Sequence, residues 1–199
     1  MVYVSSTSIV QSILASYESD CPGTKANLAR ILYHGRLGGT GKLVILPVDQ
    51  GFEHGPARSF AANPAAYDPH YHYQLAIDAG LSAYAAPLGP LEAGAATFAG
   101  QIPTILKVNS SNSHATSKDQ AITASVGDAL RLGCAAIGFT IYPGADDQFE
   151  MMEEILMRVV PCNSLLVAYE QGEISLMDSF YYNNKSIENI DSGISRGTH

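Results

Sequence analysis

The chain contains no tryptophan, and its three cysteines among 199 residues are Cys21, Cys134 and Cys162. The cysteines are odd in number, widely separated and never arranged as C-x-x-C, so neither a disulfide framework nor a zinc-binding cysteine pair is predicted. Free or buried thiols of this kind are typical of a reducing compartment. We therefore expect a cytoplasmic protein.

Long apolar runs and positive charge are also scarce. No stretch approaches the roughly 18 apolar residues of a membrane-spanning helix, and the segment from Met1 to Ser6 lacks the basic start and apolar core of a signal peptide. Eleven basic against nineteen acidic residues give a net charge of −8. This charge argues against nucleic acid or an anionic membrane as partner, whereas a few local N–H groups or lysines suffice to bind a small anionic substrate.

The remaining composition, with 46% hydrophobic and 15% charged residues, is that of an ordinary globular domain. Short apolar runs predict buried strands over residues 43–48, 81–86, 104–109 and 135–141. Between and after them, helices are predicted over residues 69–79, 90–99, 118–132 and 147–158. This alternation predicts an α/β fold with a parallel sheet. A doubly wound sheet is the competing architecture, but no G-x-G-x-x-G follows the first strand.

The two ends of the chain have a different character. Before the first strand, helices are predicted over residues 1–22 and 25–35, the second capped by Thr24. A glycine-rich stretch over residues 35–41 is interpreted as a connector rather than a phosphate-binding loop, because it follows a helix and precedes a strand. After residue 158, one more strand is predicted near residues 165–168, followed by a loose terminus.

Polar residues crowd the end of the first strand, where parallel α/β folds place their chemistry. Asp49 follows this strand directly and is a candidate proton donor or acceptor, with a turn-capping role as an equal alternative. His54 is a candidate proton shuttle or ligand of a substrate hydroxyl, against a structural role in the turn. Glu53 beside it is equally well interpreted as a solvated charge.

Lys107 and a pair of histidines are two further candidates for chemistry. Lys107 lies in the apolar run from Ile105 to Val108, where burial lowers the pKa of an amine and makes it a nucleophile; the alternative is a lysine that binds substrate or pairs with an acid. His70 and His72 form an H-x-H pair, but positions i and i+2 of a helix point in different directions. We therefore predict no metal site there.

Several motifs are similar to those of class I fructose-bisphosphate aldolases of the bacterial and archaeal type. They are Gly35–Gly41, Leu46-Pro47-Val48-Asp49-Gln50-Gly51-Phe52-Glu53-His54, Ser59-Phe60-Ala61-Ala62-Asn63-Pro64, Ile105-Leu106-Lys107-Val108-Asn109 and Gly138-Phe139-Thr140-Ile141-Tyr142-Pro143-Gly144. The resemblance covers about residues 25–155. It implies a (β/α)8 barrel of which this chain holds the first four to five strands. The implied division is an N-terminal helical segment over residues 1–41, a half-barrel over 42–158 and a divergent tail over 159–199.

The resemblance also implies a reaction. Enzymes of this family cleave fructose 1,6-bisphosphate to dihydroxyacetone phosphate and glyceraldehyde 3-phosphate without a metal or cofactor, through a Schiff base between a sixth-strand lysine and the ketone. Asp49 corresponds to the catalytic acid/base. We assign His54 and Lys107 to binding of the sugar-phosphate substrate.

The sequence departs from the family after Ile155. No Trp-x-Tyr segment, no strand with a Schiff-base lysine and no phosphate-binding loop follows; Tyr169 and Lys185 do not replace them. We expect a truncated or frameshifted aldolase chain that is inactive and self-associates, because four or five strands cannot close a barrel. The alternatives are a non-catalytic half-barrel that binds itself or a full-length relative, and a small lyase that uses Lys107 as its imine-forming amine.

Overall fold

The structure is a computed structural model that describes residues 7–51, 53–55, 57–112, 114, 120–142, 145–159, 166–170 and 174–175, with side chains up to residue 154. Its helices are α1 (Ser8–Ala15), α2 (Pro22–Leu32), α3 (Pro69–Asp78), α4 (Leu88–Ala95), α5 (Val126–Arg131) and α6 (Gln148–Val159). Its strands are β1 (Ile45–Pro47), β2 (Ala83–Ala86), β3 (Thr104–Lys107), β4 (Asn109–Ser110), β5 (Ala121–Ile122), β6 (Ala136–Thr140), β7 (Leu166–Glu170) and β8 (Ile174–Ser175). Two 3₁₀ turns, η1 (Ala57–Phe60) and η2 (Pro64–Tyr67), precede α3.

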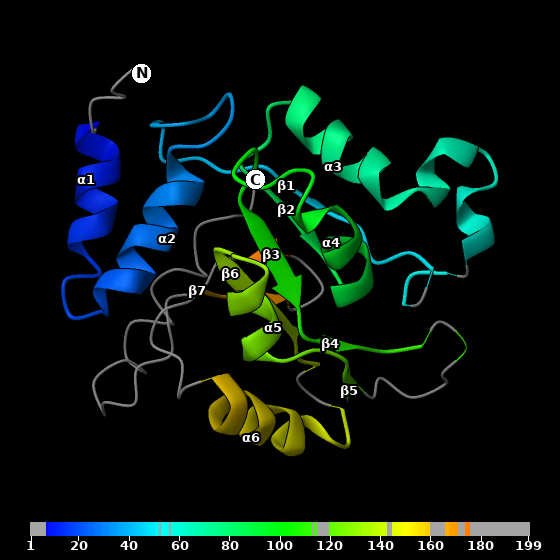
Figure 1. The fold of residues 1–199 in the computed structure, drawn as a ribbon. Helices are drawn as coiled ribbons and strands as arrows, with labels where there is room; N and C mark the ends of the chain where they lie inside the picture. Colours follow the sequence, from blue (N-terminus) through cyan, green and yellow to red (C-terminus); the bar gives the residue numbers. More distant parts are fainter. Residues whose placement is uncertain are drawn as a thin grey trace, which may run out of the picture.

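The main sheet has the strand order β1-β2-β3-β6-β7-β8 (Figure 1). Strands β1, β2, β3, β6 and β7 run parallel and follow one another in sequence order, whereas β8 pairs antiparallel with β7. Consecutive parallel strands joined by helices are the arrangement of a β/α barrel. The predicted α/β fold with a partial barrel is confirmed, and within the described residues β1 and β8 do not pair to close it.

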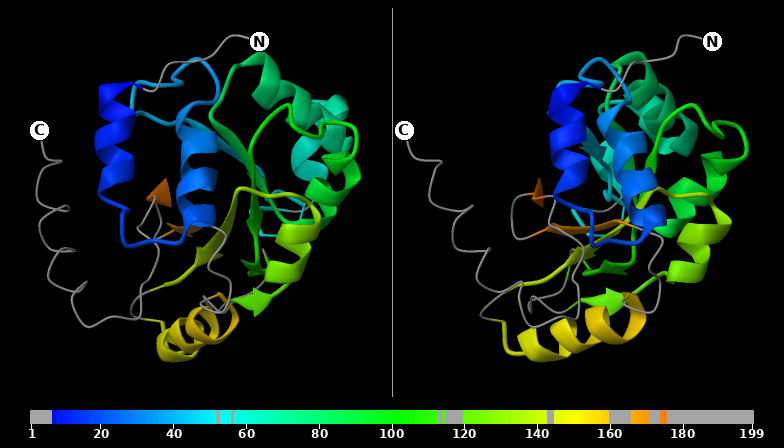
Figure 2. Two further views of the ribbon diagram at one scale, coloured as in Figure 1. Left: turned by 60° about the vertical axis from the view of Figure 1, so that its left-hand side comes forward. Right: turned by 90° about the vertical axis from the view of Figure 1, so that its left-hand side faces the viewer.

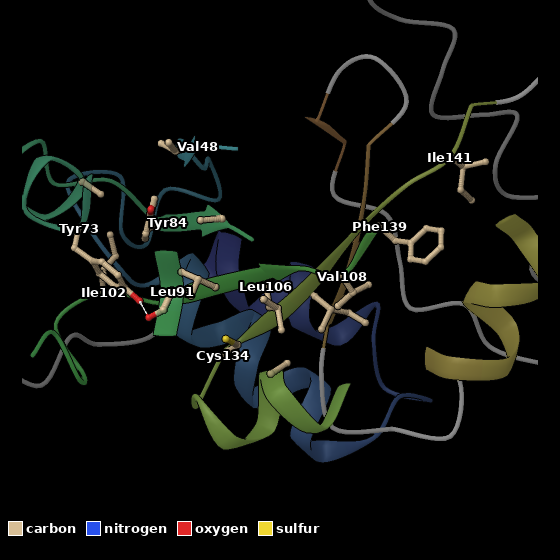
Figure 3. Packing of buried hydrophobic residues seen from close by; sticks show 14 of the residues in the cluster. Val48, Tyr73, Tyr84, Leu91, Ile102, Leu106, Val108, Cys134, Phe139 and Ile141 are labelled. Atoms are coloured by element: carbon tan, nitrogen blue, oxygen red, sulfur yellow. Dashed lines mark hydrogen bonds between the residues drawn. The ribbon is translucent and has the colours of Figure 1, made fainter. Parts of the chain in front are cut away.

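Each face of the sheet carries its own apolar cluster. On one face, Tyr84, Leu106 and Phe139 belong to a cluster that also includes buried side chains of α3, α4 and α5 (Figure 3). On the other face, Ala83, Ile105 and Ala136 pack against α1 and α2. Figure 2 shows the blue N-terminal helices and the green helices on opposite sides of the sheet. The carboxyl ends of the strands on the α1–α2 face are the position expected for a site.

The N-terminal helices follow local signals, with one correction. Thr7 caps α1 by accepting a hydrogen bond from the Val10 amide at 3.3 Å. The prediction that Thr24 caps the second helix was wrong: α2 begins at Pro22, and Thr24 is buried inside it. Proline fits the first turn of a helix because its φ is already helical and no N–H bond is lost there.

The predicted helix over residues 118–132 was also wrong in its first half. Residues 121–122 form β5, which pairs antiparallel with β4, and the helix α5 begins only at Val126. The Ser125 hydroxyl accepts a hydrogen bond from the Asp128 amide at 3.1 Å, while Asp128 accepts from the Ser125 amide at 3.0 Å. This capping box fixes the start of the helix, and the pairing with β4 holds the segment before it extended.

The glycine-rich stretch over residues 35–41 connects α2 to β1. Gly35 and Gly39 have φ values of 72° and 85°, which favour glycine. The Thr7 hydroxyl donates to the Gly39 carbonyl at 2.6 Å, and the Arg36 amide donates to the Gly80 carbonyl at 2.7 Å. The stretch is packed at the amino end of the sheet, which agrees with the connector interpretation and not with a phosphate-binding loop.

Several predictions concern residues that the structure describes only in part. Cys21 and Cys134 are free thiols, and Cys162 lies outside the described residues. Most of the predicted tail over residues 159–199 also lies outside them, so the domain boundaries stay predictions. In the described part of the chain, no helix combines the length and the hydropathy of a membrane span.

Candidate active site

The loop after β1 folds back over the end of its own strand. The Gly51 amide donates to the Gly55 carbonyl at 2.8 Å, and the Glu53 amide donates to the Asp49 carbonyl at 3.3 Å. Gly51 and Gly55 have φ values of 102° and 99°, where a side chain would be strained. This tight reversal brings the carboxyl groups of Asp49 and Glu53 to the same side of the sheet.

Lys107 reaches this loop from the end of β3. Its Nζ donates to Asp49 Oδ2 at 2.8 Å and to Glu53 Oε2. The register Lys107↔Gly138 places the lysine on the face that also carries Ile105 and Ala136, towards the carboxyl ends of the strands. Residues 58 positions apart in sequence thus form one ion-paired cluster.

The cluster extends in both directions from Lys107. Asp49 Oδ1 contacts Nδ1 of His54 at 2.5 Å, and Glu53 Oε1 accepts from Nε2 of Gln120 at 3.4 Å. The result is a continuous chain in the order Gln120, Glu53, Lys107, Asp49, His54. We call this set of residues the polar chain.

Exposure changes along the polar chain from one end to the other. The side chains of Glu53, Lys107 and Asp49 are 5%, 10% and 14% exposed, whereas that of His54 is 54% exposed. The interpretation of Glu53 as a solvated charge was therefore wrong. A buried carboxylate requires a charged partner or several hydrogen bonds, and Lys107 and Gln120 supply them.

The two central charges stabilise each other. Burial alone raises the pKa of Asp49, but the hydrogen bonds from Lys107 and His54 and their electrostatic attraction outweigh it, so the pKa of Asp49 lies below its usual value. Burial alone lowers the pKa of Lys107, but its hydrogen bonds to Asp49 and Glu53 and their charges outweigh it, so the pKa of Lys107 is raised. At neutral pH the cluster therefore contains the Lys107 ammonium group paired with the Asp49 carboxylate, and the same ammonium group donates to Glu53 Oε2.

This charge state bears on the roles that the sequence left open. Asp49 does not simply cap a turn, because both of its oxygens contact side chains. An ammonium group has no lone pair for attack on a carbonyl, so the geometry favours Lys107 as a binding group over an imine-forming amine. His54 keeps Nε2 for another contact, and its exposure makes it the member of the polar chain most open to solvent.

A metal is not needed to explain the acidic cluster. Asp49, Glu53 and His54 offer ligand atoms that all lie within 4.8 Å of one another. Nζ of Lys107, however, already donates to both carboxylates and supplies the positive charge that a metal would bring. His70 and His72 are not paired either: their Nε2 atoms contact the carbonyl oxygens of Ala93 and Ala66 at 3.1 and 2.9 Å.

Sequence reasoning missed two residues that shape the site. Gln120 was placed in the predicted helix, and nothing in its sequence context distinguishes it. Asn109 is completely buried; its Nδ2 donates to the Thr140 carbonyl at 2.7 Å, and its Oδ1 accepts from the Thr140 amide at 2.8 Å. Asn109 therefore joins the ends of β3 and β6, and the sequence signal for this role is its position as a polar residue directly after a buried strand.

Comparison with known proteins places this chain in a family. The sequence model of the DeoC/LacD family aldolases matches residues 43–169. A probable fructose-bisphosphate aldolase class 1 from Chlamydia muridarum is 43% identical over 126 residues, which are 62% of this chain and 36% of that protein. A fructose-bisphosphate aldolase class 1 from Thermoproteus tenax is 39% identical over 116 residues, which are 58% of this chain and 43% of that protein.

The fold agrees with the sequence match. A solved structure of a Schiff base-forming fructose-1,6-bisphosphate aldolase superposes with a TM-score of 0.61 and 33% identity, covering 72% of this chain and 56% of that one. The chain thus spans less than half of the length of the two curated relatives described above. Because the family match covers more than half of the 199 residues and includes both strands that carry Asp49 and Lys107, the chain belongs to the DeoC/LacD family of aldolases.

Proposed function

We propose that this chain carries the acid/base part of a class I fructose-bisphosphate aldolase, which cleaves fructose 1,6-bisphosphate to dihydroxyacetone phosphate and glyceraldehyde 3-phosphate. The observation that carries the proposal is the contact of Asp49 with Lys107 at the carboxyl ends of β1 and β3. The names of the relatives support it, since those proteins are class 1 fructose-bisphosphate aldolases.

Each candidate residue has a role that its surroundings support. Breaking the carbon–carbon bond of an aldol requires a base that removes the proton of the hydroxyl group next to that bond. Asp49 is largely buried at the end of β1, and its lowered pKa keeps it ionised at neutral pH, as such a base requires. Lys107 and His54 contact its two oxygens and are the groups we assign to oxygen atoms of the sugar phosphate.

The Schiff-base amine of the reaction is not Lys107 in this proposal. Imine formation needs a neutral amine, and the two carboxylates around Lys107 favour its protonated form. Its fixed positive charge instead suits the stabilisation of a negatively charged oxygen that develops during cleavage. We therefore propose that the 199-residue chain by itself binds the triose phosphate but does not cleave the sugar bisphosphate.

Borohydride trapping tests this assignment. The chain is incubated with dihydroxyacetone phosphate, reduced with borohydride and examined by intact-mass and peptide mass spectrometry. The expected result is no covalent adduct at Lys107. An adduct mapped to Lys107 would make this lysine the imine-forming amine and overturn the assignment.

Binding is measured separately by ligand-observed NMR with dihydroxyacetone phosphate. Lys107→Met is expected to weaken binding about tenfold, as is typical for the loss of a charged hydrogen bond worth about 1.5 kcal/mol. Lys42→Met is the control, because Lys42 is exposed before β1 and outside the polar chain. No detectable binding by the unmodified chain, or equal losses in both variants, would contradict the proposed function.

We also propose that the chain self-associates. In the described residues, β1 pairs with β2 along one edge and has no strand on its other edge. Uncovered strand edges template pairing with another chain.

A further inference from the structure

Glu53 lies between Gln120 and Lys107 in the buried part of the polar chain, and the proposed function gives it no role. Its side chain is 5% exposed, and its two oxygens have different partners. Oε2 accepts from Lys107, and Oε1 accepts from Gln120 at 3.4 Å. A carboxylate fixed at both oxygens has little freedom to turn away from the lysine.

Gln120 reaches Glu53 from a separate element. It directly precedes β5, whose pairing with β4 returns the chain to the end of the strand that carries Lys107. Gln120 is 6% exposed, and among the described residues its buried Oε1 atom has no hydrogen-bond partner. A buried unpaired amide oxygen is costly, so the fold around β5 has to hold the amide in this position, where its Nε2 group donates to Glu53.

Lys107 needs both carboxylates for its charge. If Asp49 were the only carboxylate beside Lys107, it would have two tasks. It would have to offset the cost of burying the ammonium group, and it would also have to exchange a proton with the substrate. Each time Asp49 took up a proton, the ammonium would lose its counter-ion. Glu53 does not face this conflict, because it lies behind Lys107 in the buried part of the polar chain.

We propose that Glu53, anchored by Gln120, is a positioning residue that keeps Lys107 in its charged form beside Asp49 while Asp49 exchanges protons. This inference extends the proposed function, since it gives Lys107 a fixed charge for substrate binding. Its central claim concerns the protonation of Lys107 and is measurable without any aldolase activity.

Competitive labelling measures that protonation directly. The chain is exposed to a trace of acetic anhydride over a series of pH values, and the labelling of each lysine is quantified by peptide mass spectrometry. Neutral amines react and ammonium groups do not, so the midpoint of the Lys107 profile reports its charge, while the plateau at high pH reports its accessibility. Lys42, which is exposed, provides the internal reference.

Three variants separate the parts of the proposal. Glu53→Gln removes the charge and is expected to raise Lys107 labelling relative to Lys42 at pH 8 at least tenfold, corresponding to a shift of about one pKa unit. Gln120→Leu removes the anchor but leaves the charge of Glu53 in place, so a smaller rise in Lys107 labelling, about threefold, is expected. Glu53→Asp keeps the charge but shortens the side chain. The midpoint of the Lys107 profile is therefore expected to lie between those of the wild-type chain and Glu53→Gln.

Glu18→Gln is the matched control. Glu18 pairs with Lys25 at 2.5 Å on the surface, where the Glu18 side chain is 82% exposed. Surface ion pairs contribute little, so the labelling of Lys25 relative to Lys42 at pH 8 is expected to change by less than about twofold. Circular dichroism confirms that each variant is folded before labelling is interpreted.

The inference is overturned if the labelling profile of Lys107 keeps its wild-type midpoint in folded Glu53→Gln. If Glu53→Gln does not fold, a wild-type midpoint in both Gln120→Leu and Glu53→Asp overturns it. A changed plateau with an unchanged midpoint would likewise overturn it, because it would show that Glu53 only shields the lysine. Protection of Lys107 by dihydroxyacetone phosphate in the wild-type chain is recorded in the same experiment. Its loss would contradict the proposed function and leave the role of Glu53 standing.

Discussion

Asp49 and Lys107 stabilise the folded chain over the pH range in which both are charged. The pKa of Asp49 is lowered on folding, so its contribution is present above its unfolded pKa of about 4 and is lost as the pH falls through the folded pKa. The pKa of Lys107 is raised on folding, so its contribution is complete below its unfolded pKa of about 10 and is lost as the pH rises through the folded pKa. The full contribution therefore spans roughly pH 4 to 10.

Replacing Lys107 tests this residue-scale argument. Lys107→Met leaves Asp49 and Glu53 facing each other without their shared cation, and we expect the free energy of unfolding to fall by about 3 kcal/mol at pH 7. The deficit should shrink towards pH 4, where the carboxyl groups of the variant take up protons. Urea unfolding at both pH values measures it. A constant deficit would show that lost packing of the lysine stem, rather than charge, is responsible.

A suitable comparison for this variant is Lys25→Met. Lys25 also pairs with a glutamate, but that pair lies on the surface. Its removal should leave the unfolding midpoint nearly unchanged at either pH, because solvent screens the two charges. If both lysine variants behave alike, the buried cluster has no special part in stability.

At the scale of elements, local signals predicted what local interactions determine. Helix α3 begins at Pro69, where the helix over residues 69–79 was predicted to begin, and Asp68 caps it by accepting from the His70 amide at 2.9 Å. The segment before α5 was mispredicted because its strand forms only by pairing with residues Asn109–Ser110, a contact that no local pattern contains. Non-local pairing overrides propensity wherever the partner strand is already fixed.

The packing of α4 on α3 gives a second prediction. Gly94 lies against the ring of Tyr73, which stacks on Phe98 at 4.9 Å and meets Tyr84 edge-on at 4.7 Å. A methyl group at position 94 would overlap that ring, and we expect Gly94→Ala to lower stability by about 1–3 kcal/mol. Gly89→Ala in the same helix meets nothing within 4 Å. We expect Gly89→Ala to leave the melting temperature unchanged or to raise it slightly in thermal unfolding, because alanine favours helices.

The same reasoning applies to the junction of β3 and β6. Asn109→Ala removes both hydrogen bonds to Thr140, so the backbone amide and carbonyl groups of Thr140 lose this partner. A loss of about 2–4 kcal/mol is expected from two such bonds. Asn63→Ala removes one exposed bond to the Tyr71 hydroxyl and should cost less than about 1 kcal/mol. Equal losses of stability for the two variants in chemical denaturation would count against a role of Asn109 in joining β3 to β6.

At the scale of the whole molecule, the sequence identified the strand ends that carry the site but not how they meet. Acids after a buried strand pointed to Asp49, and an apolar context pointed to Lys107. That these two side chains form an ion pair depends on the parallel register of β1, β2 and β3. The sequence alone also gave no role to Glu53 or Gln120. Both are buried only because the loop after β1 and the segment before β5 fold back over the strand ends.

The open sheet leads to the last prediction, on the association of whole chains. Strand β1 includes Pro47, which has no N–H to donate and weakens the edge for pairing, but Val44 just before it is 47% exposed. We expect light scattering to give an average mass above the 21.1 kDa of one chain, rising with concentration. Val44→Lys should lower that mass because charge blunts a strand edge, whereas Leu130→Lys, on the exposed face of α5, should not. A constant monomer mass with one sharp thermal transition would show that the sheet needs no second chain.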